Sequence, residues 1–468
     1  MNQQARMSSI VRAFGNAVGT CIETRPKTAL KLLKVGFRAN NLQSHLSCFD
    51  PVSHLGLSQR YVALACGLAI LAPLRKPQES VVVNLFLPCE LLVAMDLVPQ
   101  FVEGFAGYLD GACCERGFVE YAENWGVPKT YCSYHKALLG ASLSSVLPKP
   151  QCVIHATVAC DANLNTFRTL ASYWQVPLFV LDVPAVSVGH EDSYVEEDLC
   201  VEMGQAAPNW DKAIPDEAVI YVANQFRSMA RFLEDTTHRK LNEERLAEAI
   251  RREKRSFDLY ARYQSELAFR EFTNDPLTEM YRIFLTHLQA GSPNLEKYME
   301  FLLRDVQNAP LANHGHLKKR ILWVHTLPFW QNSVARMFAL DAPCQLLGSD
   351  LSFDFLNEED DLDEKVPFES MARKLLRNSA GGSAVRRTRR VLDLAKRLHA
   401  DGVVWFCQWG CKQTLGAANL AKQILEQQGF PVLVLDGDAC DKQNINEGQM
   451  ATKMQAFFEM LGGHNAEV

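Results

Sequence analysis

Three cysteines that are far apart in the chain share one local setting. Cys411 lies in "WFCQWGCKQTLGAANL" (405–420), between a segment that we predict to be a strand and one that we predict to be a helix. Cys160 has the same position in "CVIHATVACDANLNTF", and Cys132 precedes a predicted helix in "VPKTYCSYHKALLGA". A thiolate at a helix N-terminus faces unpaired N–H groups, which lower its pKa and favour an anionic group on the sulfur. Iron–sulfur clusters are such groups, so these cysteines are candidate ligands, and the alternative for each is a small residue at a tight turn.

The remaining cysteines fit other roles. The chain contains 14 cysteines, and in the absence of a recognisable secretion signal we do not expect a disulfide framework. No Cys-x-x-Cys pair is present, so the spacing matches neither a zinc pattern nor a compact ferredoxin run. Cys407 is predicted to point into the sheet, Cys89 and Cys440 are second-rank candidates at strand ends, and Cys113 and Cys114 are interpreted as structural. Packing is the predicted role of the others: Cys21, Cys48, Cys66, Cys152, Cys200 and Cys344.

The composition is that of an ordinary soluble protein. The net charge is −6, so no global positive field indicates a nucleic-acid partner. The longest uncharged apolar run (61–74) has 14 residues, which is too short to span a bilayer and predicts a buried helix. The basic N-terminal residues lack the pattern of a secretory signal and are interpreted as an amphipathic arm, with a mitochondrial presequence as the alternative. We therefore expect a cytoplasmic protein without a membrane span.

The pattern along the chain predicts an α/β fold. A strand (152–159), a helix (161–175) and a second strand (176–184) form one β-α-β unit, which implies neighbouring parallel strands. A similar unit occupies 403–438. Further predicted strands are 80–87 and 320–328, and further predicted helices are 88–109, 383–402 and 446–461. We predict two flavodoxin- or Rossmann-like parallel-sheet lobes (76–195 and 316–468), an N-terminal helical arm (1–75) and a helical middle segment (196–315).

Two charged stretches are interpreted as solvated surface. The middle segment is helical and rich in charge from about 214 to 305, and Asn242 is predicted to cap its clearest helix, with Glu243 and Glu244 in the first turn. Its charges alternate in sign, which disfavours a nucleic-acid role and favours a solvated helical hairpin between domains. The acidic stretch 357–365 is interpreted as a surface loop, with cation binding as the alternative.

Ordered motifs in both predicted lobes resemble a known family. They are "LPCELLVAMDLVP", "YCSYHKALLGASL", "LPKPQCVIHATVACDANLNTFRTLASYWQVPLFVLDVP", "WGCKQTLGAANLAKQILEQQGFPVLVLDGDACD" and "EGQMATKMQAFFEML". Together they resemble the 2-hydroxyacyl-CoA dehydratase family, most closely its alpha-type subunit. The superfamily also contains benzoyl-CoA reductase subunits and double-cubane cluster proteins. The resemblance covers about 80–190 and 320–462, and it departs from the family at Asp96, where glycine is usual.

The resemblance implies a cofactor and partners. Family members hold one [4Fe-4S] cluster per subunit through three cysteines, which map here to Cys132, Cys160 and Cys411. One iron stays open to water or substrate. The family works as a heterodimer of related subunits on a CoA thioester, and a separate ATP-hydrolysing iron–sulfur activator supplies the electron. This sequence shows no G-x-x-x-x-G-K-S/T phosphate loop, which agrees with the ATPase being another protein.

The implied reaction is a radical elimination of water from an (R)-2-hydroxyacyl-CoA to an enoyl-CoA, after ATP-driven one-electron activation. Ser133 and His135 follow the first ligand on one helical turn and are the candidate catalytic residues, with Lys136 as a further candidate for a proton or the CoA phosphates. Lys412 and Gln413 have a similar position at the second helix entry. Asp161 is interpreted as a helix N-cap, and His155 as a core residue.

Two other functions stay open. One is an ATP-dependent low-potential reductase of the benzoyl-CoA reductase or double-cubane type, in which an [8Fe-9S] cluster would need about six converging thiolates. The other is a paralogue without a cluster that serves as a scaffold. The sequence does not name the acyl group, the partner or a possible flavin.

Overall fold

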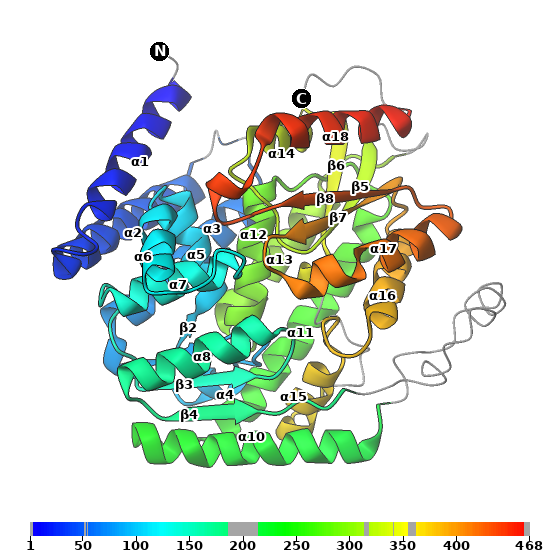
Figure 1. Ribbon diagram of the computed structural model, residues 1–468. Helices are drawn as coiled ribbons and strands as arrows, with labels where there is room; N and C mark the ends of the chain where they lie inside the picture. The colour runs from blue at the N-terminus through cyan, green and yellow to red at the C-terminus, as the bar shows by residue number, and fades with distance from the viewer. Residues whose placement is uncertain are drawn as a thin grey trace.

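The protein is built around two four-stranded parallel sheets (Figure 1). The computed structural model describes residues 3–50, 53, 55–185, 214–312, 318–339, 341–353 and 362–462. The first sheet has the order β2-β1-β3-β4, with β1 (Ser80–Val83), β2 (Val98–Phe101), β3 (Cys152–Ala156) and β4 (Leu178–Leu181). The second has the order β6-β5-β7-β8, with β5 (Lys319–Val324), β6 (Cys344–Ser349), β7 (Gly402–Gln408) and β8 (Val432–Gly437). The predicted α/β fold with two parallel-sheet lobes is confirmed.

The single helix predicted over 88–109 is wrong. The structure has a short helix α4 (Glu90–Ala94), then strand β2, then helix α5 (Val102–Gly111). Asp96 ends the helical turn because it adopts a positive φ of 54°. The next residues pair in parallel with β1, and their side chains are mostly buried. A strand buried on both faces has no alternating pattern, so an apolar run cannot distinguish it from a helix; β6 escaped prediction for the same reason.

Asp96 replaces the usual glycine at a backbone position that requires this conformation. Aspartate tolerates the left-handed region better than most residues, and the Asp96 carboxylate forms an ion pair with Arg245 of the middle segment. The Asp96 carbonyl also accepts a hydrogen bond of 2.6 Å from the Arg239 guanidinium. The departure from the family is therefore accommodated locally, by a salt bridge that holds the turn after α4 against the middle helices.

We expect Asp96→Gly to change the free energy of unfolding by less than about 1 kcal/mol. Loss of an exposed ion pair is small, and glycine adopts a positive φ without strain. Asp96→Val should destabilise by roughly 1–3 kcal/mol, because a β-branched residue is strained there. Urea denaturation of both variants measures the difference. Equal stabilities for the two would show that the backbone at residue 96 is not constrained.

Helices cover both sheets. Around the first sheet lie α6 (Glu115–Asn124), α7 (Ser133–Leu143) and α8 (Asp161–Trp174). Around the second lie α14 (Asn332–Met337), α16 (Ala384–Arg397), α17 (Lys412–Gln427) and α18 (Glu447–Met460). Helix α15 (Pro367–Leu376) instead packs into the core of the first sheet, where Met371 and Leu375 lie in one cluster with Val81 and Ile154. Single 3₁₀ turns occur at η1 (Pro77–Glu79), η4 (Asp350–Ser352) and η6 (Lys442–Asn444). The helix predicted to close at Gly402 in fact ends at Arg397, and Gly402 begins β7.

The middle segment supplies α10 (Asp216–Thr237), α11 (Glu243–Leu267), α12 (Pro276–Leu288) and α13 (Pro293–Gln307). The predicted cap of α11 is confirmed, since the Asn242 side chain accepts a hydrogen bond from the Arg245 N–H. The interpretation as a solvated hairpin is wrong for α12, which has eleven of its thirteen residues buried. Helix α12 runs through the centre of the molecule and packs against α3, β6 and η4 (Figure 1).

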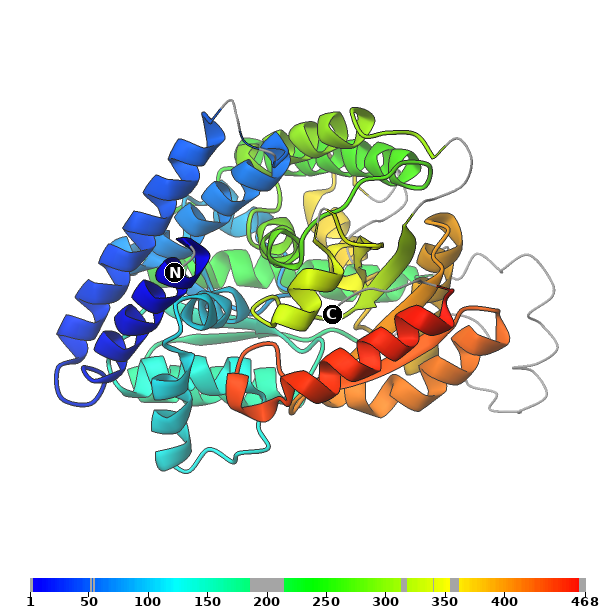
Figure 2. The same ribbon diagram turned by 90° about the horizontal axis from the view of Figure 1, so that it is seen from above.

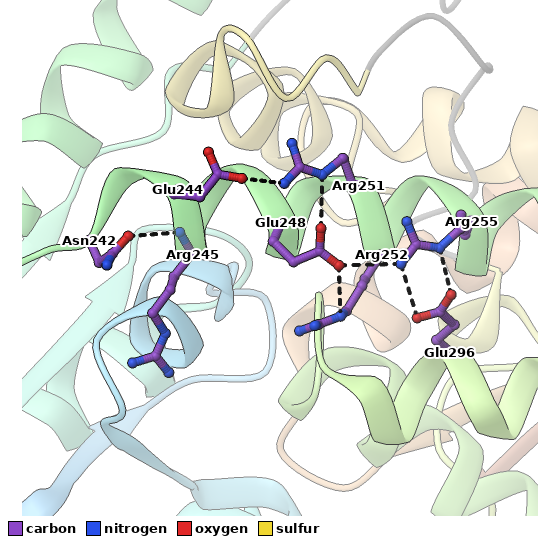
Figure 3. Close-up of polar contacts among 8 residues, drawn as sticks. All are labelled: Asn242, Glu244, Arg245, Glu248, Arg251, Arg252, Arg255 and Glu296. Atoms are coloured by element: carbon purple, nitrogen blue, oxygen red, sulfur yellow. Dashed lines mark hydrogen bonds and ion pairs between the residues drawn. The ribbon is translucent and has the colours of Figure 1, made fainter.

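The exposed face of α11 carries a network of ion pairs (Figure 3). Glu248 contacts three arginines of its own helix, and Arg255 also reaches Glu296 of α13 at 2.6 Å. The arginines involved are Arg251, Arg252 and Arg255, and Glu244 adds a further contact to Arg251. These positive charges are each matched by a carboxylate, which agrees with the prediction that α11 is not a nucleic-acid surface.

The N-terminal residues form α1 (Gln3–Gly19), α2 (Pro26–Cys48) and α3 (Leu57–Arg75), and α1 and α2 run along one side of the molecule (Figure 2). By length and apolarity α3 alone among the described helices could cross a membrane. It has eleven buried residues and packs against α2, α12 and α13, as the core helix of a soluble protein does. The predicted buried helix is confirmed. Most of the acidic stretch 357–365, and Cys200, lie outside the described residues.

Candidate functional site

The strand order of each sheet creates a switch point, where the chain crosses from one side of the first strand to the other. These points lie between β1 and β3 and between β5 and β7. Parallel sheets bind ligands outside the carboxyl ends of the strands at such points. One cavity is lined by residues that follow the four strands at these two points. They include Phe86 after β1, Cys160 after β3, His325 after β5 and Cys411 after β7. The two switch points therefore share a single cavity.

All three candidate cysteines line this cavity. Cys132, Cys160 and Cys411 are the N-cap residues of α7, α8 and α17, which confirms their predicted place before a helix. The N–H groups of His135, Asn163 and Thr414, each three residues after its cysteine, act to lower the pKa of that cysteine. The N-cap prediction for Asp161 is wrong, because Cys160 occupies that position. Asp161 is the first residue of α8 and forms an exposed ion pair with Lys412.

Direct contacts between the lobes hold the cysteine loops together. The backbone of Gly410, with a φ of 72°, packs so closely that a Cβ there would lie 2.6 Å from the Cys132 nitrogen. Trp409 Nε1 donates to the Lys129 carbonyl at 3.1 Å, and Gln413 Nε2 donates to the Ala159 carbonyl at 2.6 Å. The loop of the second lobe thus touches both cysteine loops of the first.

Within the first lobe, Tyr131 fixes the two cysteine loops relative to each other. The Tyr131 hydroxyl donates to the Ala162 carbonyl at 2.8 Å and lies 2.9 Å from Thr166 Oγ1. Tyr131 directly precedes Cys132, and Ala162 lies two residues after Cys160, so this hydrogen bond ties α8 to the entry of α7. The two sulfur atoms are held in place before any ligand binds.

The three thiols differ in acidity. Burial raises the pKa of Cys132 well above its ordinary value, and the neighbouring cysteines raise it further. Burial raises the pKa of Cys160 to about 12. At Cys411 burial also raises the pKa, but His325 and, after it, Thr414 outweigh burial and lower the pKa to about 6. A lowered pKa is therefore found only at Cys411, where His325 contributes more than the helix N-terminus, because burial dominates at the other two.

The donor set suits a cluster better than a single ion. Among the described residues no group of three histidine, cysteine or acidic side chains is arranged around one metal ion. In a cluster, each of the three thiols would bind a different metal atom. Cysteine sulfurs at helix N-termini, within walls such as Leu85, Ile283 and Phe284, match the surroundings that iron–sulfur clusters require.

The candidate residues after Cys132 point in three directions. His135 lines the cavity, and burial lowers its pKa to about 4, so the ring is neutral. Ser133 donates to the Asp438 carboxylate of the second lobe and does not line the cavity. Lys136 is buried in an ion pair with Glu123 at 2.7 Å. Successive residues point in different directions around a helix, and of these three only His135 lines the cavity.

The other predicted residues also have defined places. Gln413 lines the cavity, whereas Lys412 is exposed in its ion pair with Asp161. His155 is fully buried in β3, as predicted for a core residue. Cys407, Cys89 and Cys440 are buried and do not line the cavity. Cys114 is buried with its sulfur 3.4 Å from the Leu109 carbonyl oxygen, and Cys113 is half-buried beside it.

His325 and Glu103 are among the cavity residues that were missed from the sequence. His325 directly follows β5 and adopts a positive φ of 80°. Its N–H donates to Asp350 at 2.7 Å, and its carbonyl accepts from Ser349 at 2.7 Å, so the strained backbone is held on both sides. Glu103 enters from the first turn of α5, and its Oε2 atom is buried without a hydrogen-bond partner. His325 could have been found as a polar residue directly after a strand. No local sequence signal marks Glu103.

Glu103→Gln should change how stability depends on pH. Burial raises the pKa of Glu103 from 4.5 to about 7, although its own N–H and that of Leu85 oppose the shift. Between these values the unfolded chain loses the proton and the folded chain keeps it, so this group's stabilising contribution falls as pH rises. Between pH 4.5 and 7, the free energy of unfolding of the wild type should fall by at most about 3 kcal/mol relative to that of the variant. Urea titrations across this range measure it, and parallel curves would contradict it; Glu217→Gln, at an exposed carboxylate, is the control.

Two parallel-sheet lobes whose N-cap cysteines, two from the first lobe and one from the second, line a shared cavity at their switch points define the class of protein to which this chain is compared. Residues 84–461 match the family model described as 2-hydroxyglutaryl-CoA dehydratase, D-component. The chain belongs to this family of 2-hydroxyacyl-CoA dehydratases, which confirms the resemblance seen in the motifs.

Two curated relatives match most of the chain. It is 19% identical over 388 residues to the (R)-phenyllactyl-CoA dehydratase alpha subunit of Clostridium sporogenes, covering 80% of this chain and 87% of the relative. It is 22% identical over 415 residues to the lactoyl-CoA dehydratase subunit alpha of Anaerotignum propionicum, covering 81% of this chain and 90% of the relative. Both relatives are alpha subunits of dehydratases.

Proposed function

We propose that this chain is the iron–sulfur subunit of a 2-hydroxyacyl-CoA dehydratase, which removes water from an (R)-2-hydroxyacyl-CoA to give an enoyl-CoA. The observation that carries the proposal is the convergence of three N-cap cysteines from two lobes on one cavity. Membership of the dehydratase family supports the reaction class.

Cys132, Cys160 and Cys411 would hold the cofactor, a [4Fe-4S] cluster. A cluster with three cysteine ligands supplies a one-electron carrier and an iron that acts as a Lewis acid. Three cavity thiols favour it over a double cubane, which needs about six. Sulfur ligands from both lobes would also fix the lobes relative to each other.

The other cavity residues prepare the site for elimination. Removal of water from a 2-hydroxyacyl group takes a weakly acidic proton from the β-carbon and a poor leaving group from the α-carbon. The unpaired carboxyl oxygen of Glu103 is the group that we assign to this proton. His325 lines the cavity and lowers the pKa of the Cys411 thiol, and neutral His135 can act there as a hydrogen-bond partner. Phe86 and Phe284 exclude water.

The proposal includes partners that this chain does not supply. Because the curated relatives are alpha subunits, we propose a heterodimer with a related second subunit. The sequence has no phosphate-binding loop, so we propose a separate ATP-hydrolysing activator. A cytoplasmic location, where iron–sulfur proteins can stay reduced, completes the proposal.

Anaerobic co-production with a candidate second subunit tests the function. The purified complex is assayed for iron and sulfide, and then with 2-hydroxyacyl-CoA thioesters, activator, ATP and reductant. We expect about four iron atoms per chain and enoyl-CoA as product. About eight iron atoms per chain would indicate a double cubane, and reduction without loss of water would indicate a reductase. A chain without iron would indicate a scaffold.

A further inference from the structure

A second cavity, of about 440 Å³, lies between the N-terminal helices α1 and α2 on one side and α5 and α12 on the other. Figure 2 shows α1 and α2 lying along the body of the molecule at this place. Small-molecule sites have volumes of roughly 300–1,000 Å³ and mostly apolar walls. Six aromatic side chains contribute to these walls: Phe14, Phe37, Tyr108, Tyr281, Phe284 and Phe329.

This apolar cavity adjoins the cysteine cavity. Phe284 of α12 lines both. Helix α5 also lines both cavities. Glu103 lines the cysteine cavity, and Gly107 and Gly111, one and two turns further on, line the apolar cavity. The Phe284 ring packs over Gly107, whose Cβ position would lie 3.0 Å from Cε2. The two cavities therefore follow one another along the same helices, and the Phe284 ring separates them.

The chemistry of the walls restricts what can enter. None of the described residues that line the apolar cavity is charged, and its polar groups are limited to amide and phenol side chains such as Asn40 and Tyr108. Such walls favour an aryl or bulky alkyl group and cannot neutralise a carboxylate or phosphate. A methyl group would leave most of the volume unfilled.

The outer wall of the cavity lies outside the residues that match the family model. Helices α1 and α2 end before residue 84, where that match begins. Phe14 and Phe37 of these helices line the cavity opposite residues of α5 and α12. The part of the cavity that would contact the far end of a ligand is thus formed by residues outside the matched stretch.

We propose that the apolar cavity holds the side chain of the acyl group, so that this enzyme prefers 2-hydroxyacyl thioesters with an aryl or bulky alkyl side chain. Methyl-sized and carboxylate-bearing acyl groups are the disfavoured classes. The Phe284 ring turns aside when the side chain enters from the cysteine cavity. This inference rests on the proposed dehydratase function, which supplies the thioester.

Gly111→Leu tests the inference. A Cβ at residue 111 would lie 4.0 Å from the Phe329 ring, so a leucine side chain fills the cavity without a backbone clash. The probe is 3-phenylpropanamide, an uncharged aryl compound whose binding to the isolated chain needs no cluster. We expect calorimetry to show binding to the wild type and at least about a tenfold weaker binding to the variant.

Two further variants separate a filled cavity from a damaged fold. Gly111→Ala adds only a methyl group and should bind the probe like the wild type. Gly448→Leu makes the same large change in α18, beside neither cavity, where the nearest atom to the new Cβ is 3.6 Å away. It should bind the probe unchanged. In the active complex, Gly111→Leu should lower kcat/KM for an aryl thioester about tenfold or more and leave a methyl-bearing thioester unaffected.

The outcomes distinguish the inference from the function. A wild type that does not bind the probe, or a Gly111→Leu variant that binds it equally well, overturns the inference even if dehydration occurs. Equal preference for methyl-bearing and aryl thioesters does so too. A wild type that dehydrates no thioester overturns the proposed function, and with it the assignment of a substrate, even if the probe binds.

Discussion

The Cys411→Ala variant will lose its bound iron and keep its fold. The sulfur lies in the shared cavity at the N-terminus of α17, and His325 already favours its thiolate. With two thiols left, both from one lobe, a cuboidal cluster has too few ligands to remain bound. We expect anaerobically prepared wild type to contain about four iron atoms per chain and the variant less than about one. Iron and sulfide analysis, with absorbance near about 400 nm, measures the loss.

Cys407→Ala is the matched control for this change. Cys407 lies four residues earlier, in strand β7, is 2% exposed and has its sulfur 3.9 Å from the Thr414 carbonyl oxygen. Its removal leaves a small gap in the core and should cost roughly 1 kcal/mol of stability while the iron content stays unchanged. Iron lost from Cys407→Ala and retained in Cys411→Ala would reverse the assignment of the two thiols.

Gly410→Ala should separate the lobes at the site without unfolding either one. A methyl group at residue 410 would meet the Cys132 nitrogen at 2.6 Å and the Tyr131 carbonyl carbon at 2.7 Å. Both are backbone atoms, so a side-chain rotation cannot relieve the contact. The loop that carries Cys411 must therefore move away from Cys132. We expect iron content to fall severalfold, and the stability of the metal-free chain to fall by roughly 1–3 kcal/mol.

Gly429→Ala isolates the effect of the clash. Gly429 also has a positive φ, of 84°, but nothing lies within 4 Å of its Cβ position. This variant has similar backbone strain and no steric contact, so it should be destabilised without losing iron. Urea denaturation and iron analysis of both variants give the comparison. If Gly429→Ala loses iron to the same extent, general destabilisation and not the approach of the two lobes controls cluster binding.

The sequence predicted that the three cysteines stand directly before helices, but it did not predict the other residues that line their cavity. Cys132, Cys160 and Cys411 were recognisable because each stands directly before a helix, which is a local property. Glu103 reaches the cavity only because the chain turns at Asp96, after α4, and β2 then pairs in parallel with β1. No pattern near Glu103 reports this route, and a single helix over 88–109 would have pointed its side chain elsewhere.

The direction in which a side chain points was the second property that the sequence did not predict. Ser133, His135 and Lys136 share one helical turn, and only the packing of α7 against the second lobe and against α6 decides which one faces the cavity. His325 was missed because its importance comes from Asp350 and Ser349, which hold its backbone from β6 and η4. Contacts between lobes are absent from local patterns, so sequence alone could not rank these residues.

The division of the sulfur ligands between the lobes sets an order of events in the cell. A ribosome completes Cys132 and Cys160 early, but Cys411 follows Cys160 by 251 positions in the chain. Domains generally fold as units during synthesis, so the first sheet can form with two thiols and nothing to complete the set. Insertion of the proposed cluster would then wait until the second lobe has emerged and docked. A nascent chain that stalls between the two sheets would display a pair of reactive thiols with no metal to protect them from oxidation.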